Sequence, residues 1–325
     1  MDPRTRKTKD GMEFSESFLS RVAWLYFIGG LTQGEVAKQL GTTRLRVNKA
    51  LGVAREEGLV RIEIASPFSS TYKLEKQLVD RYSLEGARVG VLPAQSDDYH
   101  EAVGTALSYY LNDVLSNKKI QSIGVSWGNT LERSIRNLKS VNRPNLEVVS
   151  LMGGLSRGTS INTFGIAASF ASRLSAEYHL FAAPLYSEST QSARTLLNTA
   201  LLKEQIAKAV NVDIAILVVG DMSEKSLLVR EGLPQGITLK ELKKAGAIGD
   251  ILGRFLDKNG KPVDHPINKR AISPPHQCIA EFKHSVLAAA GTHKVPIVHA
   301  VLKAGLIKNF VTDTNTAEKL LSYEL

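Results

Sequence analysis

The sequence holds a single cysteine, Cys278, among its 325 residues. One thiol cannot build a disulfide framework or a cysteine-rich zinc site, and this usage fits a reducing cytoplasm, where we expect the protein to act. Long apolar runs are also absent. No stretch of about 18 uninterrupted apolar residues occurs, so a membrane span is not expected. Residues 1–10 are polar and lack the apolar core of a secretory signal.

Signatures of catalysis, cofactor binding and metal binding are equally scarce. There is no Walker lysine motif and no G-x-G-x-x-G fingerprint, and we expect no cofactor. No G-x-S-x-G or H-E-x-x-H motif occurs, and no two of the seven histidines stand four residues apart, so no metal site is expected. Asp221 and Asp250 are candidate bases, although such acids more often cap loops or hold hydroxyl groups. We therefore assign no catalytic residue.

The composition is that of a soluble globular protein with room for two or three domains, at 43% apolar and 22% charged residues. The formal net charge is +9, but its distribution gives only weak support for nucleic-acid binding. Residues 1–65 hold eleven basic and eight acidic residues. The excess lies largely in residues 225–308, with fourteen basic and six acidic residues. A basic domain of this kind can bind an anionic small molecule or can simply be solvated.

Residues 32–56 predict two helices joined by a tight turn. Thr32 and Glu35 form a capping-box pattern at the start of the first helix. Gly41 suits the left-handed residue that ends it. Residues 43–55 carry four positive charges and no negative ones. This pattern is typical of a helix-turn-helix whose second helix enters the DNA major groove by its N-terminal end. An ordinary helical hairpin with a solvated basic face is the alternative.

The second helix supplies the candidate DNA contacts. Thr42 or Thr43 caps it, and the residues expected to face inward are Leu45, Ala50, Leu51 and Ala54. The candidate DNA-binding residues are Thr43, Arg44, Arg46, Asn48, Lys49 and Arg55. Arg44 or Arg46 can make bidentate contacts to guanine and Asn48 to adenine, while Lys49 or Arg55 suits phosphate.

The flanking segments complete a module that we place at residues 1–65. Residues 18–28 form an apolar helix that can close a three-helix core, and residues 60–64 alternate like a short strand, which we interpret as a wing. Residues 1–12 are expected to be a disordered tail, with a DNA-contacting arm as the alternative. Residues 66–71 are rich in turn-forming residues and are expected to form a linker.

Residues 66–325 alternate short apolar strands with helices, which predicts a largely parallel α/β sheet covered on both faces. The expected strands are 87–92, 120–126, 146–152, 178–182, 214–219, 286–290 and 307–312, with an extended segment at 248–256. The expected helices are 72–82, 99–115, 129–138, 164–175, 193–209, 238–244, 295–303 and 313–321.

Three loops of this domain are candidates for ligand binding, because ligands of parallel sheets sit beyond the carboxyl ends of the strands. The first is 126–130, where Gly128 permits a close backbone approach and Asn129 and Thr130 offer hydrogen bonds beside a helix N-terminus. The second holds Gly153 and Gly154, and the third is 291–294, where the Lys294 amine can pair with a phosphate. Each loop alone can be a simple turn. Together, in a basic domain, they favour a phosphate-ester pocket.

The sequence resembles the SorC/DeoR-type sugar-responsive bacterial transcription regulators. The segments that carry the resemblance are residues 31–41, 123–130, 246–255 and 311–317. The resemblance implies a winged helix-turn-helix joined to an effector domain with the fold of sugar-phosphate isomerases and glucosamine-phosphate deaminases. It also implies a homotetramer, or a dimer passing to a tetramer, on operator DNA.

The same resemblance implies that Gly128, Asn129, Thr130 and Lys294 hold a phosphate, and that Asn162, Asp250 and Gly153 approach the sugar. Two departures from the family pattern, Met152 and Thr292, leave an unphosphorylated polyol open as effector. We therefore predict a sugar- or polyol-responsive regulator that binds operator DNA, with residues 66–325 as its effector-binding and oligomerisation domain. The alternatives are a sugar-phosphate isomerase or deaminase and a non-specific nucleic-acid-binding protein.

Overall fold

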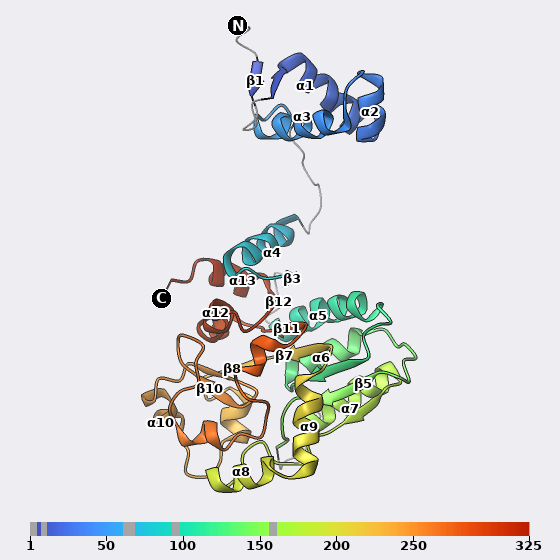
Figure 1. The fold of residues 1–325 in the computed structure, drawn as a ribbon. Helices are drawn as coiled ribbons and strands as arrows, with labels where there is room; N and C mark the ends of the chain where they lie inside the picture. Colours follow the sequence, from blue (N-terminus) through green and yellow to red (C-terminus); the bar gives the residue numbers. More distant parts are fainter. Residues whose placement is uncertain (1–4, 8–11, 61–68, 93–97, 156–160, 325) are drawn as a thin grey trace. The chain divides into compact units, whose positions relative to one another are not determined.

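The computed structural model describes residues 5–7, 12–60, 69–92, 98–155 and 161–324. The chain divides into two compact units, Met1–Ser66 and Pro67–Leu325. The boundary expected after residue 65 lies one residue from this division. Figure 1 shows the elements of both units. Each unit has its own apolar core and is described by itself below.

The smaller unit is built on helices that pack around a common core. Its elements are β1 (Thr5–Lys7), β2 (Glu13–Ser15), α1 (Glu16–Ala23), the π-helical turn η1 (Trp24–Ile28), α2 (Gln33–Gln39) and α3 (Arg44–Glu56). Buried side chains from all three helices, among them Leu19, Val36 and Val47, close the core. Three helices with this apolar interior match the core expected around the helical hairpin.

The turn chemistry of the hairpin is as expected from the sequence. The Thr32 hydroxyl accepts a hydrogen bond from the Glu35 backbone N–H, and the Glu35 carboxylate accepts one from the Thr32 N–H at 2.8 Å. Gly41 has a φ of 60° and ends α2 in the left-handed region. Thr43 caps α3 and accepts a hydrogen bond from the Arg46 N–H at 3.2 Å. These caps fix where α2 ends and α3 begins.

Two expectations for this unit were wrong. Leu45 is 62% exposed, because the buried stripe of α3 runs through Val47, Ala50 and Ala54, and Leu45 lies nearly opposite that stripe. Residues 5–7 are not a disordered tail but form β1, which pairs antiparallel with β2. Phe14 in β2 is 1% exposed and anchors this hairpin in the core. The expected wing falls mainly on residues 61–64, outside the described residues.

The larger unit is organised by a seven-stranded, fully parallel sheet. Its strand order is β3-β12-β11-β7-β4-β5-β6. The strands are β3 (Gly86–Gly90), β4 (Ser122–Val125), β5 (Glu147–Ser150), β6 (Glu177–His179), β7 (Ile214–Leu217), β11 (Ser285–Ala288) and β12 (Asn309–Asp313). The predicted mostly parallel α/β class is confirmed.

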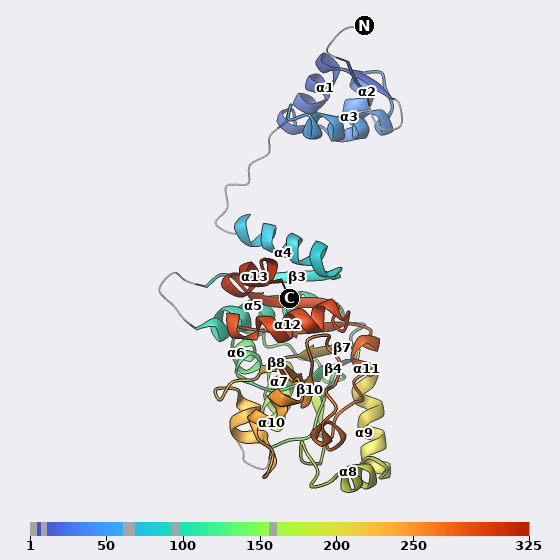
Figure 2. The same cartoon turned by 90° about the vertical axis from the view of Figure 1, so that its left-hand side faces the viewer.

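Helices cover both faces of this sheet (Figure 2). Along β7, Ile214 and Ile216 pack on one face, and Ala215 and Leu217 on the other. The first face is covered by α5 (Tyr99–Leu115), α6 (Asn129–Asn137) and α7 (Thr163–Leu174). The second is covered by α4 (Ser69–Tyr82), α9 (Ala200–Val210), α12 (Val295–Lys303) and α13 (Thr314–Leu321). Burial on both faces explains the nearly continuous apolar strands.

Several elements differ from their predicted bounds. The helix expected at 193–209 is two helices, α8 (Thr190–Leu197) and α9, because Thr199 caps a new helix with its hydroxyl. The segment 248–256 is a hairpin of β9 (Gly249–Ile251) and β10 (Arg254–Leu256), and β8 (Val219–Asp221) extends it to a three-stranded antiparallel sheet. Residues 69–71, expected in a linker, already belong to α4.

The remaining elements are short. They are η2 (Leu228–Gly232), α10 (Leu239–Lys244), η3 (Pro266–Lys269), α11 (Cys278–Glu281) and η4 (Thr292–Lys294). Of the helices in the described part of the chain, none is both long and apolar enough to cross a membrane.

Candidate functional site

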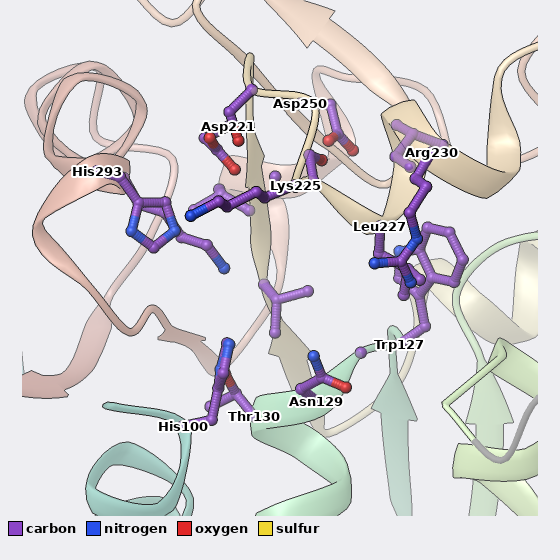
Figure 3. A pocket seen from close by; sticks show the side chains of 18 residues that line it. His100, Trp127, Asn129, Thr130, Asp221, Lys225, Leu227, Arg230, Asp250 and His293 are labelled. Carbon is purple, nitrogen blue, oxygen red and sulfur yellow. The ribbon is translucent and has the colours of Figure 1, made fainter. Parts of the chain in front are cut away.

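A cavity of about 570 Å³ opens at the carboxyl ends of β4, β7 and β11, three neighbouring strands of the parallel sheet. Its lining comes from the start of α6, from the segment around β8 and η2, and from the loop before α12 (Figure 3). The lining residues are His100, 127–130, 218–221, Ser223, 225–228, Arg230, Asp250, His293 and Lys294. A pocket at this edge of a parallel sheet is where such folds hold their ligands.

The N-terminus of α6 forms one wall of the cavity. Gly128 has a φ of 112°, a conformation that favours glycine, and it precedes the helix without a side-chain cap. The first backbone N–H groups of α6 therefore lie beside the cavity without a capping side chain, and the helix dipole favours an anion there. Thr130 is buried, and its hydroxyl lies 2.8 Å from Nδ1 of His100.

Cationic side chains converge on the same cavity. Lys294 is half-buried at the start of α12, and Lys225 and Arg230 stand more exposed on the segment after β8. Burial lowers the pKa of the Lys294 amine, while the nearby carboxyl groups of Asp221 and Asp250 oppose that shift. Burial and the Lys294 charge lower the pKa of His100 to about 4, so this imidazole is neutral near pH 7.

Two carboxyl groups also line the cavity, and Asp221 lies beside Lys225 (Figure 3). Asp221 is 8% exposed at the end of β8, and Asp250 is 4% exposed in β9. Burial raises the pKa of Asp250 to about 7, although the Gly253 N–H donates a hydrogen bond to it at 3.3 Å. Near neutral pH Asp250 therefore titrates between a carboxylate acceptor and a carboxylic acid that can also donate, which suits recognition of hydroxyl groups.

Five of the seven predicted effector residues line this cavity, namely Gly128, Asn129, Thr130, Asp250 and Lys294. The structure does not bring Gly153 and Asn162 into it. A side chain at Gly153 would meet the Pro184 carbonyl oxygen at 2.4 Å. The glycine is therefore explained by the close approach of the Gly153 and Pro184 backbones. The Asn162 amide instead exchanges two hydrogen bonds with the backbone of Leu155.

Sequence reasoning missed His100, Lys225 and Arg230. His100 stands at the start of α5, in the loop region after β3, so the strand-edge rule used for the other loops also applied to it. Lys225 and Arg230 follow β8, whose first residue, Val219, was predicted to belong to the same strand as β7. Only the recognition that a new strand begins at Val219 would have placed these two cations at the pocket.

The candidate DNA residues lie on α3 or at its cap. Arg44, Arg46 and Arg55 are exposed, and Lys49 is half-buried. Asn48 is also exposed, and its side-chain oxygen accepts a hydrogen bond from the Gln33 side chain at 3.3 Å. Thr43 uses its hydroxyl as the helix cap. Among the residues that the structure describes, no cluster of three or more His, Cys, Asp or Glu side chains could hold a metal ion.

Known proteins are similar to this chain over both of its units. Residues 66–322 match the family model described as "Putative sugar-binding domain". The transcriptional regulator LsrR of Escherichia coli is 31% identical over 312 residues, covering 94% of this chain and 95% of that protein. The erythritol catabolism regulatory protein EryD of Brucella abortus is 26% identical over 306 residues, covering 94% and 96%.

Solved structures share the fold. The full-length sorbitol operon regulator SorC from Klebsiella pneumoniae superposes with a TM-score of 0.69 at 24% identity, covering 94% of this chain and 98% of that one. These relatives are named as regulators, which favours a regulator over the enzyme alternative. The resemblance seen in the sequence is thereby confirmed: the chain belongs to the SorC/DeoR-type family of sugar-binding transcriptional regulators.

Proposed function

We propose that this regulator binds operator DNA through α3 and that a phosphorylated sugar or polyol in the cavity of the larger unit controls its affinity for DNA. The observation that carries the proposal is the pairing of the uncapped N-terminus of α6 with the Lys294 amine around one cavity. Backbone N–H groups at a helix start and a nearby amine are a recurrent phosphate cradle.

The rest of the cavity suits a chain of hydroxyl groups. Asp221, Asp250 and the neutral His100 offer acceptors and donors at buried or half-buried positions. A volume of about 570 Å³ is in the range of small-molecule sites. Two relatives carry erythritol and sorbitol in their names, and both compounds are polyols. We therefore place the effector among polyols and sugars of this size, with a phosphate at the α6 end.

Control of DNA binding follows from differential affinity. The effector changes the affinity for DNA only by as much as it prefers one arrangement of the protein over another. We propose a homo-oligomer, a tetramer or a dimer of dimers, as the functional form in the cytoplasm, because helix-turn-helix proteins commonly read paired half-sites. Light scattering with and without effector and operator DNA tests this part of the proposal.

We also propose that the chain does not turn over its ligand. Among the described lining residues, Asp250 is held by the Gly253 N–H and His100 lies against Thr130, so neither is paired with the other as acid and base. Incubation of the purified protein with isomerase and deaminase substrates checks this point. Product formation at enzyme-like rates would favour the enzyme alternative.

The decisive experiment is a thermal-shift comparison of matched ligand pairs, because a ligand that binds the native state raises its stability. Sorbitol and sorbitol 6-phosphate, and erythritol and erythritol 4-phosphate, are compared with inorganic phosphate. We expect a phosphorylated member to raise the melting temperature more than its unphosphorylated partner. A larger shift with the free polyol would overturn the phosphate assignment.

Lys294→Met tests the cradle directly, and Lys303→Met is the matched control, an exposed lysine on the same helix. Loss of a charge-assisted hydrogen bond costs about 1.5–3 kcal/mol, so we expect the best phosphorylated ligand to bind at least about tenfold more weakly to Lys294→Met. Lys303→Met should bind as the wild type does. Equal affinities of the two variants, measured by calorimetry, would remove Lys294 from the site.

A further inference from the structure

Arg46 has surroundings unlike those of the other basic residues on α3. Its guanidinium carbon lies 5.5 Å from the ring centre of Phe14 and 5.4 Å from that of Phe18. The two rings are stacked on each other, with centroids 5.8 Å apart and an interplanar angle of 13°. The guanidinium therefore lies nearly equidistant from both rings. A cation at this distance from an aromatic face is held by the ring quadrupole.

The aromatic pair is itself firmly placed. Phe14 belongs to β2 and is buried in the core of the smaller unit, and Phe18 packs against that core from α1. Ser15, the last residue of β2, caps α1 by accepting a hydrogen bond from the Phe18 N–H at 3.2 Å. The rings are thus fixed by the strand, the cap and the core, and they form a rigid platform beside the N-terminal half of α3.

The contact with the platform leaves the hydrogen-bonding edge of Arg46 unused. Within the described part of the chain, the Arg46 guanidinium has no hydrogen bond or ion pair, and the side chain is exposed. Its five N–H donors therefore remain for another partner. A guanidinium that is already ordered loses less conformational freedom when it binds, which favours a contact of fixed geometry.

We infer that Phe14 and Phe18 are positioning residues that orient Arg46 for a bidentate contact with one guanine in the major groove. This inference rests on the proposed DNA binding by α3 and names Arg46, rather than Arg44, as the arginine that reads a base. Arg44 is also exposed, but no contact with an aromatic ring orders it in the described structure. The competing explanation is that Arg46 only covers apolar rings with its stem.

The experiment uses the full-length chain and a DNA duplex selected by the wild-type protein from a randomised library. Four variants are compared with the wild type. Arg46→Lys keeps the charge but loses the planar fork, and Phe18→Leu keeps an apolar side chain but loses the ring. Arg44→Lys tests the other candidate arginine, and Arg21→Lys, at an exposed position of α1 outside the candidate DNA contacts, is the matched control. Affinities are measured at one salt concentration for the selected duplex and for duplexes with each base pair replaced in turn. Thermal unfolding of every variant reports on the fold.

We expect Arg46→Lys to weaken binding to the selected duplex by about 5-fold to about 150-fold, the usual value of a good bidentate base contact. The preference at one G·C pair should flatten, while affinity for an unrelated duplex should stay within about twofold because the charge remains. Phe18→Leu should weaken the preference at the same base pair by a smaller factor. Arg44→Lys should leave the preference at that base pair intact, and Arg21→Lys should bind every duplex as the wild type does.

Three results would overturn the inference. In the first, Arg46→Lys leaves every base preference intact. In the second, Phe18→Leu lowers the melting temperature without changing the preference at the G·C pair. In the third, Phe18→Leu lowers the affinity for all duplexes by the same factor. Each would show that the aromatic contact is structural. If the selection enriches no duplex at all, the proposed DNA binding fails, and this outcome is distinct from the other three.

Discussion

Asp313 allows a quantitative prediction about the loop that carries Lys294. Its side chain is fully buried at the end of β12, where it caps α13. One carboxylate oxygen accepts hydrogen bonds from the Gly291 N–H at 2.9 Å and from the Thr316 hydroxyl at 2.6 Å. The other accepts one from the Thr316 N–H at 2.8 Å. A single side chain thus ties the start of the cavity loop to the start of α13.

Asp313→Ala removes these bonds in a place that water does not easily reach. Loss of the helix cap costs about 1 kcal/mol, and an unsatisfied buried N–H at Gly291 costs about 1–3 kcal/mol. We therefore expect the free energy of unfolding to fall by about 3 kcal/mol. For a unit of this size, about 1 kcal/mol corresponds to about 2–4 °C, so the melting temperature should fall by about 6–12 °C.

The assay is thermal unfolding monitored by circular dichroism, with Asp98→Ala as the matched control. Asp98 also caps a helix, α5, by accepting a hydrogen bond from the Glu101 N–H at 3.0 Å, but it is exposed. Water can replace that bond, so we expect a loss of only about 1 kcal/mol. Equal shifts for the two variants would refute the reasoning, because burial would then make no difference. Hydrogen exchange at Gly291 gives a second measure and should accelerate only in Asp313→Ala.

Two further predictions concern Asp250 and Tyr82. Burial raises the pKa of Asp250 from 3.8 to about 7, so the stability gained from protonated Asp250 is present below about pH 4 and is lost as pH rises through 7. Relative to Asp250→Asn, the free energy of unfolding of the wild type in urea should therefore fall by up to about 4 kcal/mol between pH 4 and pH 8. Parallel pH profiles of the two proteins would contradict this. The Tyr82 hydroxyl lies 2.9 Å from Nδ1 of the buried His299. Tyr82→Phe should lower the free energy of unfolding by about 1–2 kcal/mol, measured by thermal unfolding. Tyr72→Phe, at a 56% exposed position on the same helix, should leave it unchanged. Equal effects of the two substitutions would show that the Tyr82–His299 hydrogen bond contributes nothing to stability.

The sequence by itself determined those helices and strands whose signals are local. Local caps need only neighbouring residues, so Thr32, Glu35 and Gly41 defined the helical hairpin before any packing was known. Apolar runs between helices likewise predicted buried parallel strands. The glycine and threonine of residues 126–130 marked a candidate ligand loop, because a βα turn and a helix N-terminus are both local features.

Only the tertiary structure decided which of these residues share a site. The strand order β11-β7-β4 places the loops after three strands around one cavity, and no local pattern encodes that order. The packing of α5 against α6 brought in His100, which contacts Thr130. Gly153 and Asn162 stay outside the cavity, because Gly153 packs against the Pro184 backbone and Asn162 bonds to Leu155. The same applies to Arg46, which spacing marked only as a basic residue on a helix face. Its contact with Phe14 and Phe18 arises because a strand and a helix distant in sequence pack beside α3.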